Sequence, residues 1–314
     1  FDSLYLKYEK DKSIPKQTIG AQELFQALLK ERAETGRIYI MNLDHCNTHS
    51  SFKDKVYMSN LCQEITLPTK PLTHIDDEEG EIALCILSAI NLGLIKEKEE
   101  LEELCDLSVR SLEEIIDYQK YPVKAAQKST EARRSLGIGY IGLAHYLAKK
   151  GYSYEQKLGW RQVDKLTEAF QYYLLKASND LAKEKGSCEF FNRTKYSDGI
   201  LPIDTYKKEV DEVVTRNLTY DWEWLRKEIK EHGLRHSTLS AQMPSESSSV
   251  VSNATNGIEP PRDYLSVKKS KKGPLKQVVP DYKKLKSNYT LLWDMKSNEG
   301  YINVVAVMQK YFDQ

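Results

Sequence analysis

Leu136-Gly137-Ile138-Gly139-Tyr140-Ile141-Gly142-Leu143 is the stretch of this 314-residue sequence that decides its fold. The stretch is short, apolar and rich in glycine, which is typical of a strand buried on both faces of a parallel sheet. A mostly apolar run at 82–92 predicts a second buried strand, and 239–243 predicts a third. Helical patterns separate these runs, and this alternation predicts an α/β fold with a largely parallel sheet.

Apolar residues at helical spacing mark the helices. The first stripe, Leu24 to Leu29, ends at Gly36, which suits the left-handed conformation of a helix C-cap. The segment Arg37–Leu43 predicts one more strand, and the runs 264–267 and 276–279 can pair as a hairpin. Further helices are expected over 101–116, 163–181 with Gly186 beyond it, 222–229 with Gly233 beyond it, and 302–312.

Composition limits the classes of function. Lys and Arg total 46, as do Asp and Glu, so electrostatics favours neither a nucleic-acid partner nor a membrane surface. No run of about 18 apolar residues predicts a membrane span. The chain opens on Phe1 without the pattern of a signal peptide, so we expect a piece of a longer or split protein. Five cysteines form a sparse, odd set, which predicts a reducing, cytoplasmic setting.

The first candidate site is Asn60-x-Cys62-x-Glu64, with a second thiol at Cys85. In an extended segment these three side chains share one face. A thiol beside a carboxylate can couple acid–base chemistry to redox, and two thiols can supply two electrons, so the pattern indicates reduction of a substrate rather than hydrolysis. The alternative is a strand with an inert buried cysteine, and Cys85 alone reads as a small core residue.

A second candidate follows the third strand, in the segment 243–249 with sequence MPSESSS. Small hydroxyl residues can begin a helix there, and the helix N-terminus would offer N–H groups and a positive dipole to a phosphate. The alternative is ordinary helix capping.

Three other patterns are weaker. His45, Cys46 and His49 have short metal-like spacing without a matching second ligand pair, so no metal is expected. Gly137 and Gly139 indicate tight strand packing rather than a dinucleotide fingerprint. The acidic run 76–79 indicates a solvated turn.

Taken together, these segments resemble the large (alpha, catalytic) subunit of class I ribonucleotide reductase over essentially the whole chain. The Asn-x-Cys-x-Glu pattern and the long serine–asparagine stretch are the most specific features. The matching stretches are TGRIYIMNLDHCNTHS (35–50), SNLCQEITLPTKPL (59–72), GEIALCILSAINLG (80–93), RRSLGIGYIGLAHYLA (133–148), GILPIDTYKK (199–208), HGLRHSTLSAQMPSESSSVVSNATNGIEPPR (232–262) and GYINVVAVMQKYFDQ (300–314).

The resemblance implies a role for each matching residue. Cys62 would be the thiyl radical that removes the 3′ hydrogen of the ribose, and Glu64 would take the 3′-hydroxyl proton. Asn60 would hydrogen-bond the sugar hydroxyls. Cys85 would be one of two reducing cysteines. The diphosphate would be bound by Ser245, Glu246, Ser247 and Ser248.

The resemblance also implies a fold: the second, C-terminal half of a ten-stranded α/β barrel with a central finger loop. One partial barrel domain would span 1–314, with the finger loop at about 55–70 and the half-barrel at about 80–314. The other reducing cysteine and the allosteric regions that bind ATP and dNTP would lie upstream, and the relay tyrosines and tail cysteines beyond Gln314. Half a barrel exposes strand edges, so we expect it to need the remainder of the large subunit.

The implied substrate is a ribonucleoside diphosphate, and no cofactor would be bound in this chain. A small (beta) subunit with a di-iron tyrosyl radical would supply the radical, thioredoxin or glutaredoxin the electrons, and the large subunits would form a homodimer. Two alternatives stay open. One is an adenosylcobalamin-dependent reductase, and the other is a non-catalytic split-gene chain that completes a barrel begun by another polypeptide.

Overall fold

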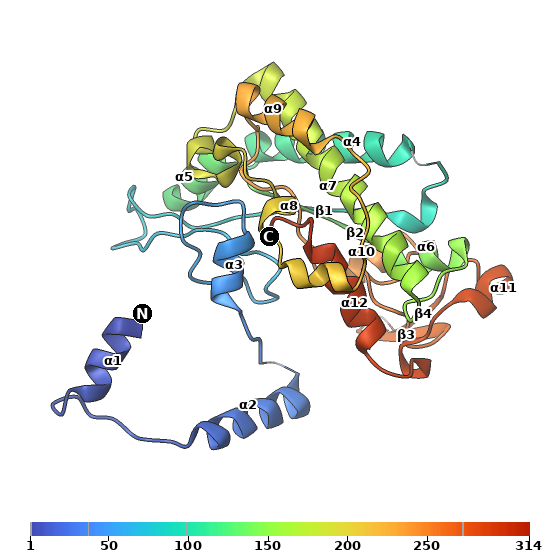
Figure 1. Ribbon diagram of the computed structural model, residues 1–314, viewed down its shortest axis with the longest axis horizontal. Coiled ribbons are helices and arrows are strands. Elements are labelled where there is room, and N and C mark those ends of the chain that lie inside the picture. The colour runs from blue at the N-terminus through green and yellow to red at the C-terminus, as the bar shows by residue number, and fades with distance from the viewer. Residues whose placement is uncertain (1, 37, 98, 272) are drawn as a thin grey trace. The chain divides into compact units, whose positions relative to one another are not determined.

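The chain divides into two compact units, Phe1–Met41 and Asn42–Gln314 (Figure 1). The structure is a computed structural model that describes residues 2–36, 38–97, 99–271 and 273–314. These units are defined by compactness alone, so the single barrel domain expected over 1–314 stays a prediction.

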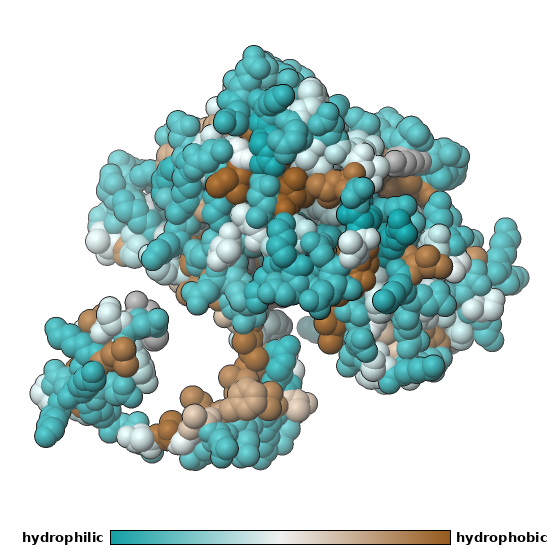
Figure 2. All heavy atoms as spheres, in the orientation of Figure 1, coloured by the Kyte–Doolittle hydropathy of each residue, from teal (hydrophilic) through white to brown (hydrophobic). Residues whose placement is uncertain are grey.

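The N-terminal unit consists of two helices that bury none of their residues, α1 (Asp2–Lys10) and α2 (Ala21–Thr35). Gly36 ends α2 with φ 63°, and its N–H donates to the carbonyl of Arg32, so the predicted helix and cap are confirmed. The apolar stripe of α2 is open to solvent, because Leu24 and Phe25 are 57% and 61% exposed. Figure 2 shows apolar atoms at the surface of this unit.

Two parallel strands form the centre of the larger unit, β1 (Ile86–Asn91) and β2 (Leu136–Ile141). They pair in register from Ile86 opposite Leu136 to Asn91 opposite Ile141, and every residue of β2 is buried. The segment 239–241 runs parallel on the other side of β2, where Ile138 donates to the carbonyl of Leu239 and accepts from Ala241. The α/β class is therefore confirmed, and among the described residues the sheet is open rather than a closed barrel.

Glycines in β2 let neighbouring groups approach closely. A Cβ at Gly137 would lie 2.6 Å from a methyl of Leu87 and 2.7 Å from the sulfur of Cys85, and one at Gly139 would overlap the carbonyl of Ala241. Side chains at these two positions would push β1, β2 and the segment 239–241 apart. This segment makes a single bridge, between Ser240 and Ile138, and is not the regular strand predicted over 239–243. The tight packing inferred from the sequence is confirmed.

Long helices cover the sheet. Figure 1 shows α4 (Glu99–Tyr118) and α7 (Lys157–Lys185) beside one another, and α4 also packs on β1. On its other sides α7 contacts α9 (Trp222–His232) and α12 (Glu299–Gln309). These four helices confirm the predicted stripes, with Gly186 and Gly233 directly after α7 and α9.

A hairpin of β3 (Leu265–Ser270) and β4 (Gly273–Val278) confirms the predicted pairing, with Leu265 opposite Val278. The remaining helices are α3 (Leu43–His49), α5 (Lys124–Arg133), α6 (Leu143–Lys150), α8 (Pro202–Thr205), α10 (Glu246–Val251) and α11 (Tyr282–Leu285). Short 3₁₀ turns lie at Leu92–Leu94, Phe191–Arg193, Lys195–Asp198, Lys208–Glu212, Lys286–Asn288 and Leu292–Asp294. No helix in the described part of the chain has the length and apolarity needed to cross a bilayer.

The strand predicted over Arg37–Leu43 is wrong. Residues 38–42 have no regular structure, α3 begins at Leu43, and Arg37 lies outside the described residues. Tyr39 and Ile40 are 48% and 47% exposed, and no described strand pairs with them. An apolar run without a neighbouring strand has no ladder of hydrogen bonds to hold it extended.

A buried carboxylate, Glu113, joins α4 to the residues that directly precede β2 and the segment 239–241. Its oxygens accept hydrogen bonds from Arg134 Nε at 2.7 Å, Arg235 Nε at 2.7 Å and His236 Nε2 at 3.1 Å. Burial alone would raise the pKa of Glu113, but the three donors together hold it well below its usual range. The ionised form is therefore part of the folded structure.

A second buried carboxylate, Asp313, lies against the segment 239–241. It accepts hydrogen bonds from the backbone N–H groups of Leu239 at 3.1 Å and Ser240 at 2.8 Å, and from the hydroxyl of Tyr196 at 2.6 Å. A side chain thus satisfies amides at the outer edge of this segment.

Candidate functional site

Cys62 lies in a turn rather than in the extended segment that the spacing predicted. The N–H of Gln63 donates to the carbonyl of Asn60 at 3.2 Å, and the Asn60 side-chain oxygen accepts from Ile65 N–H at 3.2 Å. Gln63 has φ 62°, which reverses the chain. The expectation that Asn60, Cys62 and Glu64 share one face of an extended strand is therefore wrong, and the turn leaves Cys62 exposed.

Two arginines hold both ends of the segment 55–80, which carries Cys62. Arg133, 1% exposed, donates to Asp54 Oδ2 and to Glu81 Oε2, each at 2.9 Å. Arg193 Nε lies 2.7 Å from the same Asp54 oxygen. Asp54 directly precedes this segment and Glu81 directly follows it, so the cluster holds its two ends together.

Glu64 is half-buried and carries an oxygen, Oε2, that is fully buried. Among the described residues nothing donates a hydrogen bond to this oxygen. A desolvated carboxylate oxygen without a donor costs free energy, which a ligand hydroxyl could recover by donating to it.

Cys85 is half-buried directly before β1, and its sulfur accepts a hydrogen bond from Gln314 Nε2 at 3.5 Å. Burial, and to a smaller extent the charges of Asp313 and Glu64, raise the pKa of Cys85 to about 12, although the hydrogen bond from Gln314 lowers it. Cys85 is therefore a neutral thiol at physiological pH, within electrostatic reach of Glu64.

One cavity of about 750 Å³ brings Cys62 together with part of the predicted phosphate segment. Ser245, Glu246 and Ser249 line it, as do residues of the β3–β4 hairpin. Of the other predicted site residues, Ser247 and Ser248 are exposed on α10, and they, Asn60, Glu64 and Cys85 are not among the residues that line this cavity.

The hydroxyls of Ser245 and Ser249 are available to a ligand. Ser245 precedes α10 without capping it through its side chain, so the ordinary capping interpretation is wrong. Both Oγ atoms are buried, and neither has a hydrogen-bond partner in the described part of the chain. No sequence pattern distinguishes Ser249 from its neighbours, because only the fold places it at the cavity.

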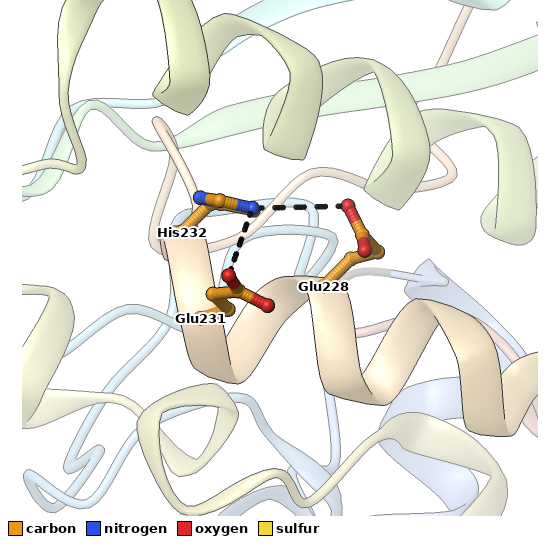
Figure 3. Close-up of side chains that lie close together, drawn as sticks. All are labelled: Glu228, Glu231 and His232. Carbon is orange, nitrogen blue, oxygen red and sulfur yellow. Dashed lines mark ion pairs between the residues drawn. The ribbon is translucent and has the colours of Figure 1, made fainter.

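Figure 3 shows three potential metal ligands on α9, Glu228, Glu231 and His232. His232 Nε2 lies 3.8 Å from Glu231 and 4.0 Å from Glu228, while Glu228 also pairs with Lys183 at 2.7 Å. All three ligands come from one helix end and each already takes part in an ion pair, so the geometry describes a surface ion-pair cluster. In the metal-like pattern of His45, Cys46 and His49, a ring nitrogen of His49 lies 2.9 Å from the hydroxyl of Thr205.

Comparison with known proteins gives a consistent result. A family model described as "Ribonucleotide reductase, barrel domain" matches residues 1–287. The chain is 61% identical to the ribonucleoside-diphosphate reductase subunit alpha of Haemophilus influenzae and 59% identical to the ribonucleoside-diphosphate reductase 1 subunit alpha of Escherichia coli K12. It is 43% identical to the corresponding subunit alpha of phage T4. Each match covers 100% of this chain and 42% of the relative.

Proposed function

Since the chain belongs to the ribonucleotide reductase barrel-domain family, we propose that it carries the radical thiol and the diphosphate site of a ribonucleoside-diphosphate reductase. The observation that supports this most strongly is the shared cavity. An exposed thiol, Cys62, and two buried hydroxyls without partners among the described residues, Ser245 and Ser249, line the same space although they lie far apart in sequence.

The proposed reaction uses Cys62 as a thiyl radical that takes the 3′ hydrogen atom of the ribose. Glu64 accepts the proton of the 3′-hydroxyl, and the 2′-hydroxyl takes a proton from one of two reducing thiols and leaves as water. These thiols, Cys85 and a second cysteine of the complete enzyme, supply two electrons and the hydrogen that the 2′ carbon gains, and they close a disulfide. Cys62 then returns the hydrogen to the 3′ carbon. The amide of Asn60 would donate to the sugar hydroxyls.

The environments of these residues suit such roles. A reductant that delivers hydrogen should rest as a thiol, and the raised pKa of Cys85 keeps it protonated. A base needs a free acceptor atom, and the buried Oε2 of Glu64 has no donor within the described residues. Ser245, Glu246, Ser247 and Ser248 would surround the diphosphate, with Ser249 as an addition to that set.

The whole enzyme's partners belong to the same proposal. The relatives are named alpha subunits, which implies another kind of subunit. We infer a small (beta) di-iron subunit that generates the radical, thioredoxin or glutaredoxin as the electron source, the remainder of the large subunit, and a homodimer of large subunits in the cytoplasm. ATP and dNTP effectors would bind outside this chain.

Replacing Cys62 with serine in the complete enzyme tests the proposal. We expect C62S to abolish reduction of a ribonucleoside diphosphate while binding of that nucleotide stays nearly unchanged. Cys46, half-buried on α3 and not among the cavity residues, gives the matched control C46S, which should retain turnover. Normal turnover by C62S would refute the thiyl role.

A further inference from the structure

The β3–β4 hairpin forms one wall of the cavity that holds Cys62, and it carries a cation to it. Lys268 of β3 lines the cavity, and its Nζ lies 3.0 Å from Glu246 Oε1 and donates to the Glu246 carbonyl at 3.2 Å. Glu246 begins α10 directly after Ser245. Lys268 therefore holds its charge at the same cavity as the Ser245 and Ser249 hydroxyls, which have no partner among the described residues.

The hairpin is separate from the central sheet and is weakly attached to its surroundings. Its two strands form a separate sheet within the described residues, and a two-stranded ribbon is only marginally stable by itself. The side-chain contacts that join it to its surroundings include the Lys268–Glu246 pair and a hydrogen bond from Gln277 Nε2 to the Ala254 carbonyl at 3.1 Å. A second cavity of about 700 Å³ lies along β4, so the ribbon has open space along both strands.

The ion pair that tethers the hairpin is easily exchanged. The side chains of Lys268 and Glu246 are 33% and 69% exposed, and pairs this accessible contribute little to stability. An anionic ligand at Ser245 would meet the carboxylate of Glu246 as a like charge. A diphosphate carries more negative charge than one carboxylate and offers more acceptor oxygens, so it competes well for the ammonium group.

We propose that Lys268 is a substrate-binding residue that leaves Glu246 for a diphosphate oxygen of the nucleotide and draws the β3–β4 hairpin over the cavity. The inference rests on the proposed function and extends it, because it assigns the positive charge that the serine hydroxyls of this site do not supply. Closure of the hairpin would also reduce the access of water to the space around Cys62.

Binding to the complete enzyme tests the proposal through the matched variants K268Q and K269Q. Lys269 is the next residue of the same strand, is exposed, and is not among the cavity residues. We expect K268Q to bind CDP about 10-fold more weakly, as expected for the loss of one charge-assisted contact. Binding of cytidine, which lacks phosphate, should be unchanged. K269Q should bind CDP as the wild type does, and K268R should recover most of the affinity.

Two further measurements separate binding from a merely structural role. Glu246→Gln removes the competing carboxylate but keeps the backbone N–H through which residue 246 would contact the diphosphate, so CDP should bind at least as tightly as to the wild type. CDP should also slow amide hydrogen exchange in β3 and β4 of the wild type but not of K268Q. Equal CDP affinity for K268Q and K269Q, or a 10-fold loss in E246Q, would overturn the inference while wild-type turnover still supports the proposed function. Absence of wild-type turnover would instead count against the proposed function.

Discussion

Replacing Glu113 with glutamine tests how strongly the buried ionic cluster holds α4 to the sheet. The carboxylate accepts three hydrogen bonds, whereas a glutamine amide has one oxygen and turns an NH₂ group toward the remaining donors. Breaking a buried ion pair costs about 3–5 kcal/mol. Arg134 keeps a second partner in Asp117 and Arg235 is 16% exposed, so we expect the lower end, about 3 kcal/mol.

The assay is urea unfolding of the 314-residue chain, followed by circular dichroism at several pH values. A loss of about 3 kcal/mol also corresponds to a melting temperature lower by roughly 5 °C. The pKa of Glu113 is lower in the folded state than in the unfolded state, where it is about 4.3. The carboxylate therefore contributes its full stabilisation at pH values above the unfolded-state pKa and loses it as the pH falls toward the folded-state pKa. The gap between wild type and variant should thus be constant above pH 7 and narrow below about pH 4.

Glu114 provides the matched control, because it is the next residue of α4 and its side chain is 71% exposed, paired with Lys185 at 2.6 Å. E114Q should change the free energy of unfolding by less than about 1 kcal/mol. If E113Q unfolded within that same margin, or if both variants lost equal stability, the cluster would not hold the fold as argued.

The other predictions concern Cys85 and the glycine beside it. Because burial raises the pKa of Cys85 to about 12, alkylation of Cys85 by iodoacetamide should be much slower than that of exposed Cys62 at pH 8, and its rate should rise about tenfold per pH unit; equal rates by peptide mass spectrometry would contradict this. Gly137→Ala should cost about 1–3 kcal/mol by overpacking against Leu87 and Cys85. Gly20→Ala, whose Cβ would meet only Glu23 at 3.9 Å, is its control, and equal urea midpoints would refute the packing argument.

Local patterns predicted the elements whose stability is mostly local. The helices α7 and α9 and the hairpin could be predicted because short stretches of sequence show their apolar periodicity and the glycines at the ends of the helices. The strand predicted at 37–43 is wrong because a strand needs hydrogen bonds to a neighbouring strand. The local sequence does not show whether such a neighbour is present.

The candidate site shows the same division. The residues were found through their spacing and the resemblance, but their arrangement depends on long-range packing. The alternation of Asn60, Cys62 and Glu64 imitates a strand, while a positive φ at Gln63, a residue type that rarely adopts one, makes a turn. Lys268 carried no signal among the many lysines of its segment, and only the hairpin's position over α10 distinguishes it.

The carboxylate of Asp313 also sets an order of events during synthesis. It accepts hydrogen bonds from the backbone N–H groups of Leu239 and Ser240, yet it lies 73 residues after Ser240 in the chain. At about 5–20 residues per second, a ribosome needs about 4–15 s to add that length. For that interval the segment 239–241 has an open edge, which is the state in which extended segments recruit other chains. A nascent chain is therefore most prone to aggregate before Asp313, which follows α12, is made, and a chaperone that shields this edge would matter during that interval.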